Sequence, residues 1–194
     1  MKEPLDELIF TLLSQHTSDL NRDRAWVSLQ KKFKTWSAIA NASDKQIADA
    51  IRMGGLADSK APRIKAVLEE IKAREGRYSL ASLKTKKDDQ VAEYLTSLHG
   101  IGPKTAACVL AFSLGRPALP VDTHVHRIAI RLGLVPRKAT AEATQRVLEE
   151  LIGPRQRVPT HVRLIAHGRT SCTAQRPRCE ECVLRDLCPR IGVR

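Results

Sequence analysis

Four cysteines near the carboxyl end of the chain have the type and spacing of metal ligands. They follow the pattern C-x6-C-x2-C-x5-C within seventeen residues, at Cys172, Cys179, Cys182 and Cys188. Four thiolates satisfy the ligand count of a tetrahedral zinc site and of a cubane iron–sulfur cluster. Zinc sites often use two close cysteine pairs, and this segment has one C-x-x-C. The spacing predicts a metal and leaves its identity open.

A lysine follows a glycine-rich turn in the middle of the chain. Residues 98–106 read L-H-G-I-G-P-K-T-A, so Lys104 comes directly after a proline that suits the first position of a helix. The amides around Gly100, Ile101 and Gly102 are expected to face outward at the positive end of that helix, where a phosphate binds favourably. A plain helix–helix turn would explain a lone G-x-G, but the whole string is more specific.

The residues after this lysine are expected to influence its charge state. Almost every residue from Thr105 to Leu114 is small or apolar, which predicts a central helix buried on all sides. The helix dipole and burial both disfavour the charged form of Lys104. A neutral lysine amine is a nucleophile that forms Schiff bases. The alternative is a solvated lysine that contacts phosphate.

An aspartate follows in the string V-D-T-H at residues 121–124. Because a helical stretch begins at Thr123, Asp122 on its own reads as a helix N-cap. His124 and His126 stand in no recognisable metal spacing with acidic partners. We interpret His124 as structural and His126 as a packing or surface residue, and Arg127 as support for a domain interface.

Taken together, these strings resemble the endonuclease III family of base-excision glycosylases. The family's hairpin reads leucine-proline-glycine-valine-glycine-x-lysine-threonine-alanine, and His99 replaces the proline here. The resemblance implies that Lys104 attacks the sugar C1′ and that Asp122 stabilises the oxocarbenium-like sugar and assists proton transfer. The cysteine spacing, preceded by H-G-R at 167–169, matches the family's [4Fe–4S] loop, so the cofactor expected from the resemblance is a structural [4Fe–4S] cluster.

The same resemblance implies which residues contact DNA. Residues 13–19 resemble the segment that fills the gap left by an extruded nucleotide, and alignment places the inserted position on His16, with Gln15 one residue earlier. The loop at 55–61 resembles the one that carries a leucine wedge, which would be Leu56; an ordinary loop leucine turned into the core is the alternative. Arg176 and Arg178, between the first two cysteines, are expected to bind phosphate; surface charge without a role is the alternative.

Charge and composition agree with a polyanionic partner. Lysine and arginine total 33 against 21 acidic residues, a formal charge of +12, and neutralising phosphates releases counterions. No apolar run approaches the roughly 18 residues of a membrane span, and no secretory signal is visible. We expect a monomer in the cytoplasm, associated with a bacterial nucleoid, whose partner is double-stranded DNA with a damaged base or an abasic site.

The elements that must position these residues are helices throughout. Apolar spacing predicts helices over 5–13, 60–74 and 142–151, and Ser43 with Asp44 offers a cap for a segment that ends at the Gly54–Gly55 pair. The fold class expected is all-α with two helical lobes and a DNA cleft between them. We divide the chain into a helix–hairpin–helix domain at 1–116 and a [4Fe–4S] cluster domain at 117–194.

Two departures from the family pattern accompany this prediction. The start of the chain lacks a helix that normally packs against the cluster domain, so that domain is expected to be less covered. The stretch at 82–90, with Lys84, Lys86 and Lys87, is longer than the family norm. It would either extend the DNA-binding surface or form a disordered basic loop.

The function implied is that of a glycosylase with apurinic/apyrimidinic lyase activity, which removes oxidised pyrimidines of the thymine glycol type from duplex DNA. Base release would proceed through a Schiff base on Lys104, followed by β-elimination. Adenine and thymine-mismatch glycosylases of this fold generally lack the hairpin lysine, whereas pyrimidine-dimer glycosylases remain open. The alternative is a non-catalytic or monofunctional DNA-binding iron–sulfur protein.

Overall fold

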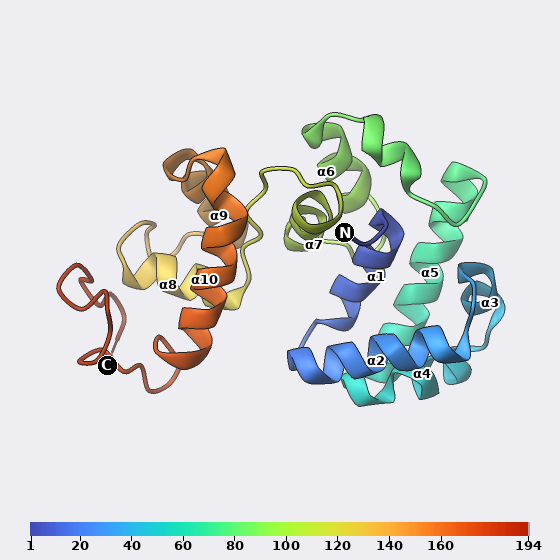
Figure 1. The fold of residues 1–194 in the computed structure, drawn as a ribbon, viewed down its shortest axis with the longest axis horizontal. Coiled ribbons are helices and arrows are strands. Elements are labelled where there is room, and N and C mark those ends of the chain that lie inside the picture. Colours follow the sequence, from blue (N-terminus) through green and yellow to red (C-terminus); the bar gives the residue numbers. More distant parts are fainter. Residues whose placement is uncertain (194) are drawn as a thin grey trace. The chain divides into compact units, whose positions relative to one another are not determined.

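The chain folds as an all-helical protein, as the sequence predicted. A computed structural model describes residues 1–193, and this part of the chain contains helices but no β-strand (Figure 1). It divides into two compact units, Met1–Gly115 and the residues from Arg116 onward. No helix within the described residues has both the length and the apolar character needed to cross a membrane.

The first unit is built from seven α-helices joined by short turns. They are α1 (Pro4–Leu13), α2 (Asp19–Lys32), α3 (Trp36–Asn41), α4 (Asp44–Ile51), α5 (Ala57–Glu75), α6 (Asp88–Thr96) and α7 (Pro103–Cys108). Two 3₁₀ turns lie between them, η1 (Arg52–Gly54) and η2 (Ala81–Thr85), and a π-helical turn, η3 (Val109–Ser113), continues α7.

Helix α1 lies at the centre of this unit. Its apolar side chains are almost completely buried, with Leu8 and Ile9 at 0% exposure. It packs against α2, α5, α7 and η3, as Figure 1 shows for the dark blue helix. A helix that is buried on nearly every side is a core element. The sequence had given that place to the stretch after Lys104 alone; the two segments share it.

That second buried stretch differs in detail from the uninterrupted helix expected over 105–114. An α-helical first part, α7, passes into the π-helical turn η3, where the Leu114 amide donates to the Val109 carbonyl at 3.1 Å. Every residue from Thr105 to Ala111 is nevertheless buried. Isolated π turns are uncommon and occur often near functional sites.

The capping residues act as the sequence indicated. Ser43 and Gln46 form a reciprocal capping box at the start of α4, which satisfies two backbone amides that have no partner within the helix. Ile64, Val67, Leu68 and Ile71 are all fully buried on one face of α5. The basic stretch at 82–90 is regular rather than a disordered loop, since η2 and the start of α6 cover most of it and Lys84 pairs with Glu3 at 2.8 Å.

The second unit is smaller and has its own core. It contains α8 (Thr123–Arg131), α9 (Ala141–Leu151), the 3₁₀ turn η4 (Pro154–Gln156) and α10 (Arg157–Thr170). Helix α8 packs on α10 and α9. Its core consists of the buried residues Leu119, Val121, Val125, Ala129, Val135 and Leu148.

The chain after α10 has no helix or strand as far as residue 193. Two of its large apolar side chains face solvent, with Val183 90% and Leu187 80% exposed, while Leu184 and Ile191 are half-buried. This segment, residues 171–193, is called the cysteine segment below because it carries four of the five cysteines. With no buried apolar side chain of its own, it needs another source of stability.

Candidate functional site

The glycine turn that precedes Lys104 is a tight connection between α6 and α7. Gly100 has a φ of +72°, which glycine adopts without strain. Gly102 precedes α7 in an extended conformation, and its carbonyl accepts from the Thr105 and Ala106 amides. Gly100 and Gly102 are exposed, but Ile101 is only 5% exposed and its amide donates to the Leu98 carbonyl at 3.1 Å. Ile101 therefore anchors the turn, and of these three residues the two glycines offer surface to a phosphate.

Helix α5 holds this turn by two polar contacts. The Glu70 carboxylate accepts from the His99 amide at 3.0 Å, and the Arg63 guanidinium donates to the Gly100 carbonyl at 2.6 Å. A proline at position 99 would have no amide to donate. The replacement of the family's proline by His99 therefore adds one hydrogen bond between the turn and α5.

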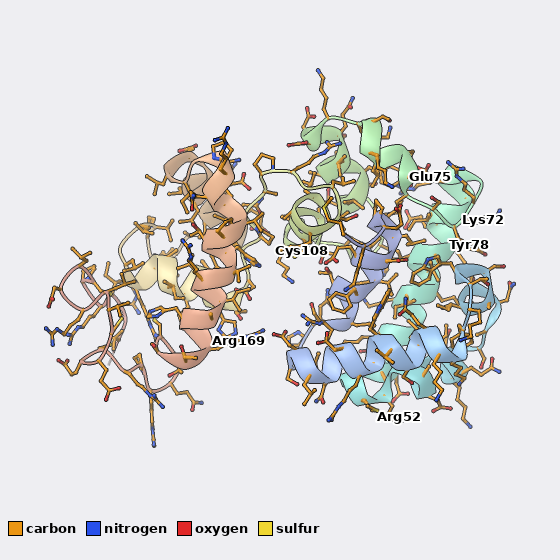
Figure 2. The ribbon with its side chains drawn as sticks, viewed as in Figure 1. Arg52, Lys72, Glu75, Tyr78, Cys108 and Arg169 are labelled. Atoms are coloured by element: carbon orange, nitrogen blue, oxygen red, sulfur yellow. The ribbon has the colours of Figure 1, made fainter. Side chains whose placement is uncertain are left out.

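Lys104 occupies the first turn of α7 and is half-buried. Cys108 lies one turn further along the same helix and is 4% exposed (Figure 2). Burial raises the pKa of the Cys108 thiol, and the positive charge of Lys104 opposes that rise. Cys108 is therefore a buried packing residue held in its thiol form.

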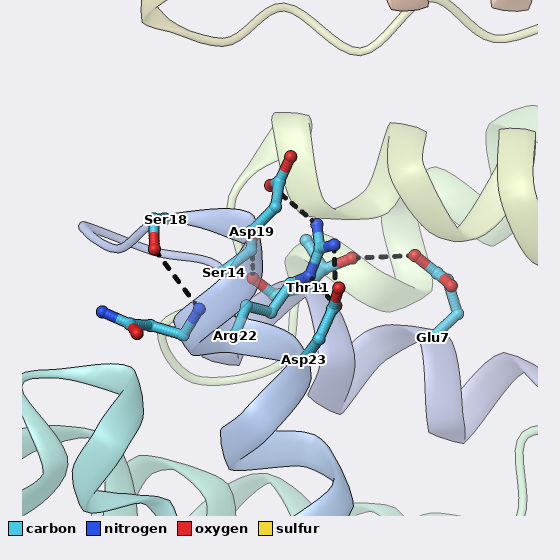
Figure 3. Close-up of polar contacts among 8 residues, drawn as sticks. Glu7, Thr11, Ser14, Ser18, Asp19, Arg22 and Asp23 are labelled. Carbon is cyan, nitrogen blue, oxygen red and sulfur yellow. Dashed lines mark hydrogen bonds and ion pairs between the residues drawn. The ribbon is translucent and has the colours of Figure 1, made fainter.

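A buried carboxylate belongs to the same neighbourhood. Glu7 of α1 is 7% exposed and accepts a hydrogen bond from the Thr11 hydroxyl at 3.1 Å (Figure 3). Burial raises the pKa of Glu7, while the charges of Lys2 and, more weakly, Lys104 lower it. The packing of α1 on α7 thus brings an acidic and a basic side chain together inside the first unit. Sequence reasoning missed Glu7, because it lies in an apolar helix with no motif around it.

Asp122 is the N-cap of α8 in the second unit. One carboxylate oxygen, Oδ1, accepts from the amides of His124 and Val125, both at 2.9 Å. The described residues provide no hydrogen-bond partner for the other oxygen, Oδ2, and the side chain is half-buried. The capping role is therefore real, and it leaves one oxygen for another task.

Histidines support the backbone around this aspartate. His161 of α10 is 4% exposed and its Nδ1 donates to the Pro120 carbonyl at 2.7 Å, two residues before Asp122. His124 packs against Gly168, where a Cβ would stand 2.9 Å from the His124 Cβ. The His126 ring donates through Nε2 to the Ala139 carbonyl. The structural interpretation of His124 and the packing interpretation of His126 are confirmed.

The two segments expected to enter the duplex both have unusual backbones. His16 has a φ of 53° and Leu56 a φ of 51°, and the only other non-glycine residue with positive φ in the range 1–193 is Arg190. Leu56 is 56% exposed, so the alternative of a leucine turned into the core is wrong. His16 is exposed, whereas Gln15 is half-buried and its side-chain oxygen accepts from Arg63 at 3.1 Å.

All four cysteines of the motif line one cavity in the second unit. None is disulfide-bonded, and the cavity walls include Ile128 of α8 and His167 of α10 as well as Cys172, Cys179, Cys182 and Cys188. Backbone amides and side chains already contact the sulfurs: the Leu184 amide donates to the Cys182 Sγ at 3.4 Å. The cysteines are therefore gathered around a common space.

The lining of this cavity has the ligand number that a cubane cluster needs. A [4Fe–4S] cluster attaches each of its four thiolates to a different iron around a common core, and the four cysteines surround one space. These residues therefore fit a [4Fe–4S] cluster.

Two arginines of α8 hold the start of the cysteine segment. Arg127 donates to the carbonyls of Gly168 and Cys172 at 3.0 and 2.9 Å. Arg131 is 7% exposed and donates to the Thr173 carbonyl at 2.7 Å and to the Cys172 Sγ at 3.2 Å. These bonds of Arg127 lie inside the second unit, where the arginine fixes the start of the cysteine segment; its support of a domain interface stays a prediction.

The two arginines expected to bind phosphate lie further along the same segment. Arg176 and Arg178 are both exposed. Their backbones are fixed, since the Arg176 carbonyl accepts from Thr173 at 2.7 Å and the Arg178 amide donates to Ser171 at 2.9 Å. The chain thus presents two cations to solvent from a fixed backbone. The nearby Arg169 lies in the last turn of α10 (Figure 2).

Comparison with known proteins places these sites in a family. Residues 9–154 match the HhH-GPD superfamily of base excision DNA repair proteins, and residues 172–188 match the iron–sulfur binding domain of endonuclease III. The chain belongs to the endonuclease III family. Within this family fold, Lys104 and Asp122 lie in the segment matched to the superfamily, and the four cysteines coincide with the iron–sulfur domain.

Individual relatives agree with this membership. Endonuclease III of Thermotoga maritima is 36% identical over 186 residues, which cover 96% of this chain and 83% of the relative. A putative DNA glycosylase of Arabidopsis thaliana is 38% identical over 192 residues. The match covers 97% of this chain and 65% of that relative's length. A solved structure of a trapped endonuclease III–DNA covalent intermediate has a TM-score of 0.84 and 29% identity, over 98% of this chain and 85% of that one.

Proposed function

We propose that this endonuclease III family member is a bifunctional DNA glycosylase and abasic-site lyase that removes oxidised pyrimidines from duplex DNA. The observation that carries the proposal is the presence of two residues in the segment matched to the superfamily: a half-buried lysine in the first turn of a buried helix, and an aspartate cap with one free oxygen. The relative solved as a covalent intermediate with DNA supports a covalent mechanism.

Lys104 is the nucleophile in this mechanism. Its neutral amine attacks C1′ of the damaged nucleotide, the N–C1′ bond forms, and the bond between C1′ and the base breaks with its electron pair leaving on the base. Asp122, through its free Oδ2, stabilises the positive charge that develops on the sugar and takes the proton released by the lysine nitrogen.

Strand scission follows from the same covalent bond. Opening of the sugar ring gives a Schiff base between C1′ and the lysine nitrogen, which makes the C2′ hydrogen acidic. Loss of that proton expels the 3′ phosphate by β-elimination, and water then hydrolyses the Schiff base and regenerates the lysine. One amine therefore serves base removal and strand cleavage.

The remaining residues bind DNA in this proposal. The exposed Gly100 and Gly102 receive a backbone phosphate, while His16 and Leu56 occupy the space from which the damaged nucleotide is extruded. Arg176 and Arg178 bind a further part of the backbone, and the four cysteines hold a structural [4Fe–4S] cluster that keeps these arginines in place. The protein acts as a monomer on damaged or abasic duplex.

Borohydride trapping tests the proposal. Duplexes that contain thymine glycol or an abasic site are incubated with the wild type and with Lys104→Gln and Asp122→Asn in the presence of borohydride. We expect a covalent protein–DNA band with the wild type, none with Lys104→Gln, and a reduction of at least about 100-fold in base release with Asp122→Asn. Free base without a band would identify a monofunctional glycosylase. Binding with neither product on either duplex would identify a non-catalytic protein.

A further inference from the structure

Two cations of α5, Lys60 and Arg63, tie together the three DNA-facing segments of the first unit. They stand three residues apart, which places them on neighbouring positions of one helix face. We refer to them as the α5 bracket. All of the contacts described below lie within Met1–Gly115.

Lys60 joins the two strained segments. It is 3% exposed, and its ammonium donates to the carbonyls of Leu13 and Gly54, both at 2.9 Å. Leu13 precedes the turn that contains His16, and Gly54 precedes Leu56. Burial, reinforced by the charge of Arg63, lowers the pKa of Lys60. A cation buried in this way is retained only where carbonyl oxygens replace its water.

Arg63 joins the first of these segments to the glycine turn. Its two terminal nitrogens donate to different acceptors, the Gln15 side-chain oxygen at 3.1 Å and the Gly100 carbonyl at 2.6 Å. A Cβ on Gly100 would stand 2.9 Å from the guanidinium. The glycine therefore makes room for the arginine, and the planar guanidinium spans two segments that are 85 residues apart in sequence.

The contacts of the α5 bracket hold the strained backbone at His16 and Leu56. A positive φ is costly for a non-glycine residue and persists only where the surroundings enforce it. Two of the three such residues in the described chain lie on the segments that Lys60 and Arg63 hold. Gln15 is held back by Arg63, while the neighbouring His16 is exposed.

We propose that Arg63 is a positioning residue that couples the phosphate-binding turn to the segment presenting His16, so that binding of the backbone and insertion into the duplex occur as one event. By engaging Gln15, Arg63 leaves His16 as the side chain that faces the orphaned base. This inference rests on the proposed function for its DNA geometry, but it requires no chemistry at Lys104.

A double-mutant cycle on DNA binding tests the coupling. The probe is a duplex with a tetrahydrofuran abasic-site analogue, which lacks the C1′ hydroxyl needed for a Schiff base, placed opposite 2-aminopurine. Affinity and 2-aminopurine emission are measured for the wild type, Arg63→Gln, Gln15→Ala and the double variant. Arg77→Gln, an exposed arginine beyond the end of α5, is the control for the loss of one positive charge.

We expect Arg63→Gln to weaken binding to this duplex. It should also reduce the emission change, and this reduction should be about fivefold larger than the one caused by Arg77→Gln. The effects of Arg63→Gln and Gln15→Ala should deviate from multiplicative behaviour by at least about threefold, because the two side chains share one hydrogen bond. The slope of affinity against salt should match that of the Arg77→Gln control, since Arg63 is bound to protein oxygens.

Three results would overturn the inference. The effects of Arg63→Gln and Gln15→Ala could prove multiplicative, or Arg63→Gln and Arg77→Gln could lose equal affinity and emission change. A salt slope reduced by about one charge beyond that of the control would make Arg63 a phosphate ligand. Arg63→Lys, which retains the charge but replaces the planar fork with a single ammonium, repeats the comparison if Arg63→Gln does not fold. The proposed function is tested separately. It fails if the wild type gives no trapped band on the natural abasic duplex.

Discussion

The first unit and the cysteine segment hold their functional residues by different means. Around Lys104 the chain uses a packed apolar core, in which the side chains of α1, α5 and α7 are buried, and polar contacts fix only the turns. Around Arg176 and Arg178 it uses almost no apolar burial; Val183 and Leu187 face solvent, and α8 arginines bind backbone carbonyls. A core can position a nucleophile precisely, whereas an extended basic surface can be fixed by a cluster with few residues.

Loss of a cluster ligand should give the largest effect, and that effect should be limited to the cysteine segment. We expect Cys182→Ser to reduce the iron content from about four atoms per chain to nearly none and to abolish the visible absorbance of the cluster. Hydrogen exchange should accelerate through residues 171–193 and remain unchanged in α1 and α5, because the core of the first unit does not depend on the metal.

The matched control for that experiment is Cys108→Ala. Cys108 is the one cysteine outside the motif and is buried in α7, so iron content should be unaffected. Loss of iron in Cys108→Ala, or retention of iron in Cys182→Ser, would contradict the ligand set.

A pair of leucine truncations should show the same contrast in the free energy of unfolding. Leu8 is fully buried in α1, and Leu8→Ala should destabilise the protein by roughly 2–5 kcal/mol, as deletion of a core leucine usually does. Leu187 is 80% exposed, and Leu187→Ala should change stability by less than about 0.5 kcal/mol. Urea unfolding followed by circular dichroism measures both. Equal losses would mean that the cysteine segment has an apolar core after all.

Glu7 provides the smallest effect and tests the cost of a carboxylate inside the first unit. Burial raises its pKa above the ordinary glutamate value of 4.5, so the folded state favours the protonated form. That contribution to stability is complete below pH 4.5 and is lost as the pH rises through the higher folded-state pKa. Glu7→Gln, which keeps the acceptor for Thr11, should therefore be more stable than the wild type at pH 7.

The pH dependence of this difference is the decisive measurement. The advantage of Glu7→Gln in chemical unfolding should shrink towards zero as the pH falls below 4.5. A variant that is less stable than the wild type at pH 7 would show that the attraction between Glu7 and its neighbours Lys2 and Lys104 outweighs burial.

The sequence predicted the elements whose signals are local. The cap at Ser43, the buried face of α5 and the cap formed by Asp122 all follow from residues within one or two helical turns. Resemblance to a family added the proposed role of Lys104 and the cluster expected at the cysteines. The π-helical turn after α7 escaped prediction, because its pattern of small apolar residues is the same as that of an α-helix.

The residues that sequence reasoning missed make contacts between distant segments. Lys60 and Arg63 look like solvent-facing cations on an amphipathic helix, but their acceptors are carbonyl oxygens of Leu13 and Gly100, 47 and 37 residues away. No spacing rule connects a side chain to a backbone oxygen at that separation. The sequence likewise does not reveal that Leu56 has a left-handed backbone and is exposed.

The most direct test of the account is to identify the amine that bonds to DNA. The borohydride-reduced complex formed on an abasic duplex is digested with nuclease and protease, and the modified peptide is sequenced by mass spectrometry. We expect a sugar-phosphate adduct on Lys104, in the peptide that contains the glycine turn. An adduct on the amino terminus or on another lysine, with Lys104 unmodified, would contradict it.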